Sequence, residues 1–301
     1  TSRKSQYLSA IAAVCAHPSG AWFATAGEDG RVRRFDAAYG ALISDTPALG
    51  ERAAALALDE SGEQLALLGT GGALVALDPQ GGAERWRVEL GEQQLGGLSF
   101  SEDGRWLLVT LSTRARVTRS TCTAALVLDA ASGRVLGRLA AGPGAVLNDA
   151  DLAADGSVAL TASSTGRVQL WRLPECEPLG APLEHELPVS SARFSRDGAR
   201  VIAALDADEN SRLVAWEVET RTRHDFAGRH GARIVSLEVA RDGERVVSTS
   251  RDMRIRTWRV DGAELASYNA WSQPIETRWT DDGQRLVTLG AAYYLHVWWG
   301  E

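Results

Sequence analysis

The acidic residues whose spacing best fits ligand binding lie between positions 206 and 217. Asp206-Ala-Asp-Glu-Asn210, with Glu217 eleven residues after Asp206, has the ligand spacing of a calcium loop, in which oxygen atoms surround the ion. Ser211 stands where such a loop has its turn glycine, and the flanking sequence predicts no helices. We therefore favour the alternative, a solvated acidic hairpin loop, and expect no metal site.

No spacing in the sequence is typical of a catalytic centre. The nucleophile elbow, the zinc-protease helix and the phosphate-binding glycine loop are all absent. The histidines and cysteines are scattered over the chain: His17, His185, His224, His230, His296, Cys15, Cys122 and Cys176. An odd number of distant cysteines fits a reducing compartment better than a disulfide framework. We expect a cytoplasmic protein that is not an enzyme and uses no cofactor.

Composition and charge exclude further classes. The chain has 301 residues, of which 45% are hydrophobic and 24% charged, so it can bury a large core. The formal net charge of −7 argues against a protein that binds nucleic acid through phosphate contacts. No apolar run is long enough to span a bilayer. The sequence thus predicts neither a nucleic-acid partner nor a membrane.

The elements that would position any site follow from an internal repeat. A short turn ending in glycine recurs seven times, at Gly20, Gly62, Gly104, Gly156, Gly198, Gly243 and Gly283, with spacings of 42, 42, 52, 42, 45 and 40 residues. Alternating apolar runs flank each turn, as expected for half-buried strands joined by a hairpin. Two further strands complete each repeat. Four strands at this period predict an all-β, seven-bladed β-propeller of four-stranded antiparallel blades, formed as a single domain by residues 1–301.

One repeat carries residues that resemble the WD40 family, which places a His, a Ser or Thr, an Asp and a Trp at fixed spacing in each blade. The sixth repeat has all four as His230, Ser248, Asp252 and Trp258. The resemblance implies that these side chains form a buried hydrogen-bonded tetrad. Other repeats keep fewer members, such as Thr161 with Trp171 or His185 with Trp216. A propeller of the TolB or prolyl-oligopeptidase type is the alternative, but repeats ending in Trp favour the WD40 interpretation.

The second repeat lacks the tetrad, and its Asp59 is expected to be an ordinary turn residue. We therefore expect Asp252→Ala to destabilise the protein more than Asp59→Ala.

Both ends of the chain suggest how the ring closes. The seventh repeat ends after its third strand, and Ser2–Leu8 precede the first strand of the first repeat. We expect this N-terminal segment to supply the missing fourth strand, because an open blade would leave an unpaired edge. The chain begins at Thr1 rather than at a methionine, so we expect a domain cut from a larger protein of bacterial type.

Two insertions carry charged residues between the second and third strands of their repeats. The third repeat has Arg114, Arg116 and Arg119 there, and the fifth has Asp206 and Asp208. By resemblance to the family, partner-binding positions also fall at Glu28, Arg52, Gln94, Asn148, Ser190, Arg233, Arg251 and Glu276. Trp271 adds a candidate aromatic anchor.

These residues predict a non-catalytic scaffold or sensor domain that docks a protein or peptide, or another domain of its own polypeptide, on a loop-rich face. The alternative is a propeller enzyme or small-molecule module with its site at the mouth of the central channel. Small or apolar residues on the first strands, such as Ala12, Ala54 and Val235, disfavour that alternative.

Overall fold

The computed structural model describes residues 10–91, 95–111, 124–279, 285–290 and 295–299. Every regular element in these ranges is a β-strand. The chain forms two compact units, one of Thr1–Ser120 with Leu126–Gly137 and the other of Thr121–Ala125 with Arg138–Glu301. The described ranges contain no helix that is long and apolar enough to cross a membrane.

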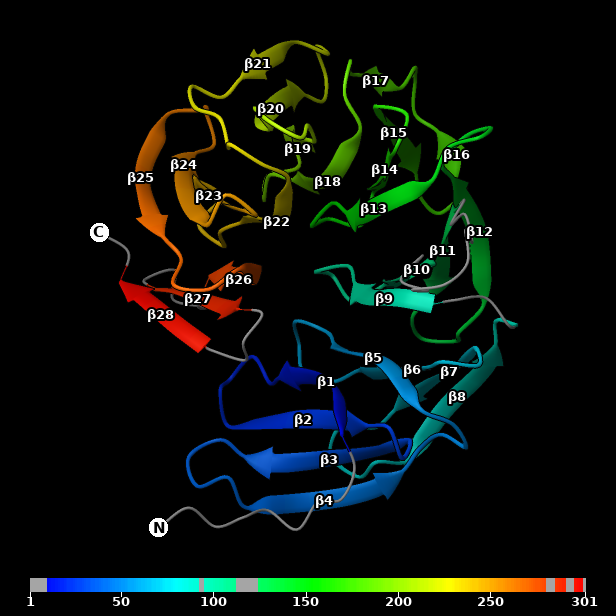
Figure 1. Cartoon of the computed structure of the whole chain (residues 1–301). Coiled ribbons are helices and arrows are strands. Elements are labelled where there is room, and N and C mark those ends of the chain that lie inside the picture. Colours follow the sequence, from blue (N-terminus) through cyan, green and yellow to red (C-terminus); the bar gives the residue numbers. More distant parts are fainter. Residues whose placement is uncertain (1–9, 92–94, 112–123, 280–284, 291–294, 300–301) are drawn as a thin grey trace. The chain divides into compact units, whose positions relative to one another are not determined.

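The first unit contains three sheets of four strands (Figure 1). In the third sheet, residues 124–125 and 138–140 belong to the second unit. The first two sheets consist of β1 (Ile11–Ala16), β2 (Trp22–Gly27), β3 (Arg31–Asp36) and β4 (Leu42–Pro47), and of β5 (Ala53–Leu58), β6 (Leu65–Gly69), β7 (Ala73–Leu77) and β8 (Glu84–Glu89). The third consists of β9 (Leu95–Phe100), β10 (Trp106–Leu111), β11 (Ala124–Asp129) and β12 (Val135–Ala140). The first strands contact one another in the order β1, β5, β9.

The second unit contains four sheets. The fourth and fifth sheets consist of β13 (Leu147–Leu152), β14 (Val158–Ser163), β15 (Arg167–Arg172), β16 (Glu177–Pro178) and β17 (Leu183–Glu184), and of β18 (Val189–Phe194), β19 (Arg200–Leu205), β20 (Arg212–Glu217) and β21 (Arg223–Asp225). The sixth and seventh consist of β22 (Ile234–Val239), β23 (Arg245–Ser250), β24 (Arg254–Arg259) and β25 (Glu264–Asn269), and of β26 (Pro274–Trp279), β27 (Arg285–Gly290) and β28 (Leu295–Trp299). The first strands again contact one another in sequence order. The expected closing segment, Ser2–Leu8, lies outside the described residues.

The repeated glycine turns join the first and second strands of their sheets, which confirms their predicted position. Six of the seven glycines are described, and each has a φ of 64–74°, a left-handed conformation that glycine adopts without steric cost. The N–H of each glycine donates to the carbonyl three residues earlier, at 2.8–3.0 Å. Gly283 lies outside the described residues.

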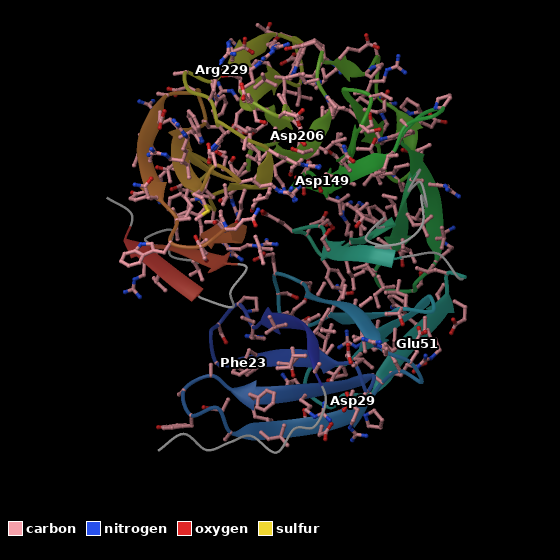
Figure 2. The ribbon with its side chains drawn as sticks, in the orientation of Figure 1. Phe23, Asp29, Glu51, Asp149, Asp206 and Arg229 are labelled. Carbon is pink, nitrogen blue, oxygen red and sulfur yellow. The ribbon has the colours of Figure 1, made fainter. Side chains whose placement is uncertain are left out.

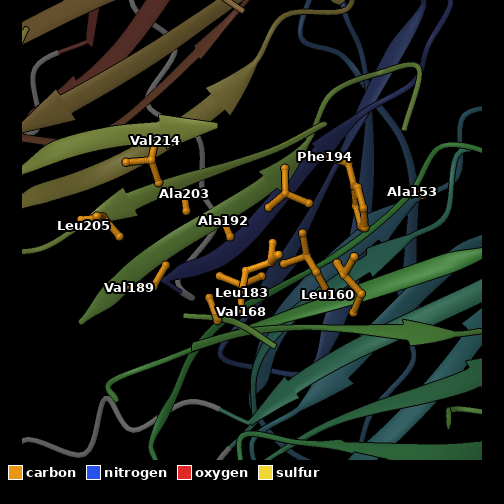
Figure 3. Packing of buried hydrophobic residues seen from close by; sticks show 13 residues of the cluster. Ala153, Leu160, Val168, Leu183, Val189, Ala192, Phe194, Ala203, Leu205 and Val214 are labelled. Carbon is orange, nitrogen blue, oxygen red and sulfur yellow. The ribbon is translucent and has the colours of Figure 1, made fainter. Parts of the chain in front are cut away.

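The core lies between neighbouring sheets, as the alternating apolar pattern requires. Between the fourth and fifth sheets, Leu160 and Val168 are completely buried in one cluster with Ala192 and Val201 (Figure 3). Truncating such a leucine to alanine costs about 2–5 kcal/mol, because the cavity collapses only in part. Each sheet is therefore stabilised mainly by the faces that it buries against its neighbours.

A β-bulge recurs at the second residue of the first strand of each sheet, shifting the register against the second strand. A bulge inserts one residue that the partner strand does not match, and so re-aims its side chain. The bulged residues are Ala12, Ala54, Gly96, Asn148, Ser190, Val235 and Ile275. This end of each sheet also carries the turn from second to third strand and the connection that enters the first strand; we call it the loop end.

Candidate functional site

The structure brings His230, Ser248, Asp252 and Trp258 together in one hydrogen-bonded chain. Trp258 Nε1 donates to Ser248 Oγ at 2.8 Å, and Ser248 Oγ lies 2.8 Å from His230 Nε2. His230 Nδ1 lies 3.0 Å from Asp252 Oδ2. An ionised carboxylate can only accept, so Nδ1 carries the proton and Nε2 accepts from the serine hydroxyl. These hydrogen bonds connect the segment before β22 to the β23–β24 turn.

Burial sets the protonation of this tetrad. Burial lowers the pKa of His230, although the nearby Asp252 carboxylate opposes that shift, so the imidazole is neutral. Burial alone would raise the pKa of Asp252. It is nevertheless lowered by His230 and by hydrogen bonds from the N–H groups of Gly231 and Arg254. The tetrad satisfies its buried polar atoms internally and presents no unshielded nucleophile, so its role is to position the loop end.

Two neighbouring sheets keep shortened versions of this hydrogen-bonded chain. In the fifth sheet Ala203 takes the strand position of Ser248, and Trp216 Nε1 donates directly to His185 Nε2 at 2.9 Å. In the fourth sheet Thr161 occupies that position and accepts from Trp171 Nε1 at 2.9 Å. The tryptophan N–H therefore has a partner in all three sheets.

The second sheet replaces the tetrad aspartate in a way that the sequence reasoning missed. Gly71 takes the position of Asp252 in the turn, and Glu51 reaches that place from the opposite connection (Figure 2). Its Oε1 accepts from the N–H of Ala73 at 3.1 Å, and a Cβ on Gly71 would overlap the carboxylate. In both sheets a carboxylate accepts from the N–H of the first residue after the turn, which is Ala73 in the second sheet and Arg254 in the sixth. The two carboxylates come from different loops.

Asp59 lies in a turn as expected, although it is deeply buried, and the larger effect expected of Asp252→Ala stays a prediction. The residue is 3% exposed, and its Oδ1 accepts from the N–H groups of Glu63 and Gln64 at 2.9 and 2.8 Å. Asp59 therefore holds its own turn in place, so its loss also leaves buried donors without a partner.

Four of the predicted partner-binding residues pair with one another. Asp206 Oδ2 lies 2.6 Å from Arg233 Nε, and Glu28 forms an ion pair with Arg52. In both pairs the acid follows the second strand of one sheet, and the arginine precedes the first strand of the next. The Asp206–Arg233 pair is the better shielded, with an aspartate side chain only 13% exposed. Burial raises the pKa of Asp206, against the opposing effect of Arg233.

The remaining candidates on the described part of the second unit also lie at its loop end. Asn148 and Ser190 are bulge residues, and Asn148 Nδ2 donates to the carbonyl of Val189 at 2.7 Å. Asp208 and Arg251 are exposed, and Trp271 is 81% exposed. Glu276 lies in β26, but its side chain does not belong to the described part of the structure. Gln94, Arg114, Arg116 and Arg119 also fall outside the described residues.

The calcium spacing does not produce a cation site. Asp206 pairs with Arg233, and Glu217 Oε1 lies 2.7 Å from Arg200 Nε within the fifth sheet. The described residues contain no cluster of three acidic, histidine or cysteine side chains able to hold a metal ion. Because β20 begins at Arg212 and ends at Glu217, the strand carries Glu217 to the end of the sheet opposite the loop.

The first strands of the fourth and fifth sheets carry a charged cluster, which differs from the small or apolar residues expected on first strands. Asp149 Oδ2 accepts from Arg193 Nη1 at 2.5 Å and from the N–H of Ala192 at 3.1 Å. Asp151 Oδ2 accepts from the N–H of Phe194 at 2.9 Å, and burial raises the pKa of Asp151. Figure 2 labels Asp149 on β13. These contacts join two sheets rather than forming an open catalytic pair.

The described part of the second unit also has a small cavity beside the fourth sheet, of about 180 Å³. Its lining includes Thr161, Gln169 and Trp171. Trp171 already donates to Thr161, and Gln169 Nε2 donates to the carbonyls of Leu170 and Gly180. Small-molecule sites usually enclose about 300–1,000 Å³, so this cavity does not favour the small-molecule alternative.

Two family models match parts of the sequence. The model described as "Outer membrane protein assembly factor BamB", of the PQQ type, matches residues 28–168. The model described as "WD domain, G-beta repeat" matches residues 4–36. Neither description names an enzyme.

Curated relatives and a solved structure agree with this fold. A coronin-like protein of Schizosaccharomyces pombe is 25% identical over 137 residues, which are 41% of this chain and 22% of that protein. Human WD repeat-containing protein 90 is 30% identical over 117 residues, 39% of this chain and 6% of that protein. The chain thus matches less than a quarter of either relative's length. The β-propeller domain of Myceliophteria thermophila Cps50 (Swd1) superposes with a TM-score of 0.71 at 12% identity, covering 98% of both chains.

Together these likenesses define the class. The chain is an all-β protein with the fold of a β-propeller, and parts of its sequence are similar to WD40 and PQQ-type repeats.

Proposed function

We propose that this chain is a non-catalytic scaffold or sensor domain of a larger cytoplasmic protein, which docks a protein or peptide on its loop end. The observation that carries the proposal is Trp271, an aromatic side chain 81% exposed in the connection that enters β26. Large aromatic residues are typical anchors of protein interfaces, especially in loops held by a rigid framework. A soluble fold gains nothing from leaving so large an apolar surface in water.

The similarity to WD-repeat proteins supports the same proposal, since propellers of that kind commonly act as protein-binding scaffolds. The charged residues at the loop end add specificity. An ion pair such as Glu28 with Arg52, both well exposed, contributes little to folding and remains available to a partner's charges. We include Arg114, Arg116 and Arg119 in the docking surface because they belong to the β10–β11 connection.

The proposal is tested by capturing partners from the native host and then reconstituting the complex from purified proteins. One variant reverses the insertion arginines to glutamate, and a second carries Arg52→Glu with Arg251→Glu. The matched control carries Arg196→Glu with Arg241→Glu, two exposed residues in turns at the opposite end of their sheets. We expect at least one loop-end variant to lose about tenfold or more in affinity while the control keeps it. Equal affinities for all three variants would contradict the proposal.

A further inference from the structure

Three exposed apolar side chains lie at the loop end of the sixth and seventh sheets. Trp271 is 81% exposed, Ile275 42% and Met253 36%. The N–H of Ala270 donates to the carbonyl of Met253 at 2.7 Å, so the connection that carries Trp271 lies against the β23–β24 turn. All three residues belong to the second unit. We refer to Met253, Trp271 and Ile275 as the Trp271 patch.

The backbone of Met253 shows that the fold alone does not explain this patch. Met253 has a φ of 67°, and it directly precedes the third strand of its sheet. The same position holds Gly30, Gly72 and Gly166 in other sheets, with φ values of 69°, 109° and 78°. A side chain in this left-handed region is strained, so glycine is the favoured residue. The sequence instead places its one methionine there, in contact with solvent.

Ile275 gives the same indication independently. It is the bulge residue of β26, where the first and second sheets have Ala12 and Ala54. Those alanines show that the bulge does not require a large apolar side chain. Two positions that hold glycine or alanine in several other sheets therefore carry large apolar residues in the sixth and seventh sheets, near an exposed tryptophan. Strain and exposure that the fold does not need point to a contact outside the fold.

Two arginines lie beside Met253 in the Trp271 patch, although the whole chain has a net charge of −7. Arg251 and Arg254 are exposed and flank Met253 within two residues on either side. The nearby carboxylate of Asp252 is occupied by His230 and by the N–H groups of Gly231 and Arg254. Charge complementarity therefore favours a partner that brings carboxylates.

We propose that the Trp271 patch binds a short acidic segment of a partner protein. A bulky apolar side chain of that segment contacts Met253, Trp271 and Ile275, and its carboxylates pair with Arg251 and Arg254. This inference rests on the proposed docking function and specifies the chemistry of its partner. An exposed apolar centre with a charged rim is the usual composition of a protein–peptide contact.

The test starts from a phage-displayed library of random 12-residue peptides selected on the purified 301-residue chain. The strongest peptide is then measured by fluorescence anisotropy against the wild type, Trp271→Ala and Arg251→Glu. Tyr39→Ala is the matched control, because Tyr39 is an equally prominent aromatic, 89% exposed, in the β3–β4 turn. We expect selected peptides with several acidic residues around one bulky apolar residue. Trp271→Ala and Arg251→Glu should each weaken binding by about tenfold, and Tyr39→Ala by less than about twofold.

Met253→Gly separates binding from folding. Glycine relieves the left-handed strain, so the melting temperature should rise or stay unchanged while peptide affinity falls by about threefold or more. A variant that gains stability and loses affinity cannot owe that loss to unfolding. If Met253→Gly binds the peptide as the wild type does, the side chain is not part of the contact and the inference is overturned.

Other results overturn the inference in distinguishable ways. Neutral or basic selected peptides, or acidic peptides insensitive to Trp271→Ala, would exclude this ligand chemistry at this patch. If those peptides were lost in Arg52→Glu instead, the docking function would stand and only the present inference would fail. If no selected peptide responded to any loop-end variant, both would fail. A concentration-dependent dimer in sedimentation analysis, abolished by Trp271→Ala, would assign the patch to a second copy of the chain and overturn the acidic-segment proposal.

Discussion

Asp206 and Arg233 form an ion pair that joins the fifth sheet to the sixth, with Oδ2 and Nε 2.6 Å apart. Glu28 and Arg52 repeat the arrangement between the first and second sheets. The positions that family resemblance selects as partner-binding residues are thus partly engaged within the protein. A partner that uses Arg233 has to compete with Asp206, so binding there exchanges one ion pair for another and favours specificity over affinity.

Removing Arg233 should destabilise the protein only where Asp206 is ionised. The pKa of Asp206 is already raised by burial, and Arg233 opposes that shift, so Arg233→Ala raises the pKa further. A carboxyl group with a raised folded-state pKa favours folding when protonated, and that contribution is lost as pH rises. We expect a loss of about 0.5–1 kcal/mol at pH 7, reduced because Arg233 is 53% exposed, and almost none at pH 3.5.

Urea unfolding at the two pH values measures this difference. Arg233→Ala with Asp206→Asn is the control that removes the buried charge, and it should show no such pH dependence. Arg52→Ala, in the more exposed pair, should cost less than about 0.3 kcal/mol at either pH. An Arg233→Ala deficit of the same size at pH 3.5 and pH 7 would mean that the arginine acts through packing.

The hydroxyl of Ser248 should contribute more than either ion pair. Ser248 is completely buried and serves both Trp258 Nε1 and His230 Nε2. Ser248→Ala leaves both without their partner, and we expect a loss of about 1–3 kcal/mol in urea unfolding. Ser248→Thr keeps the hydroxyl, and Thr161 makes the same bond to Trp171 in the fourth sheet, so it should cost less than about 1 kcal/mol. Similar losses for alanine and threonine would show that steric fit decides, not the hydrogen bonds.

The two histidines that bond to Trp side chains or the tetrad serine, His185 and His230, should make the protein less stable in mild acid. Burial lowers the pKa of His230 and of His185 below the usual value of about 6.5. The unfolded chain then binds more protons in mild acid than the folded chain does, so stability falls as pH falls through the unfolded-state pKa. From pH 7.5 to 5.5 the loss is at most about 1.4 kcal/mol per histidine. The double variant His185→Gln, His230→Gln should lose this dependence, and a wild-type slope retained in that variant would assign it to other groups.

The sequence predicted the sheets well because their signals are local. A glycine such as Gly20 or Gly243 ends the turn between the first and second strands of each sheet. The alternating apolar runs beside that turn determine which face of the strands is buried. The Asp206–Arg233 pair was not predicted as a pair, because the two residues are 27 positions apart and belong to different repeats. Asp149 and Arg193 are 44 positions apart, about one repeat. Comparing acids and arginines one repeat apart would have found the Asp149–Arg193 contact but not the Asp206–Arg233 pair.

Glu51 had no such signal, because its carboxylate replaces that of an aspartate from the opposite side of the turn.

This replacement gives a sharp prediction. Gly71→Asp alone should destabilise by about 1 kcal/mol, because the added side chain displaces the Glu51 carboxylate, the end of a flexible side chain, and places two carboxylates together. Glu51→Ala alone should cost about 1–2 kcal/mol, since the N–H of Ala73 loses its acceptor. In the double variant the new aspartate has room and can accept from Ala73, as Asp252 accepts from Arg254 in the sixth sheet. A double-mutant cycle in urea should therefore show a favourable coupling of at least about 1 kcal/mol, and strictly additive losses would show that the two carboxylates are not interchangeable.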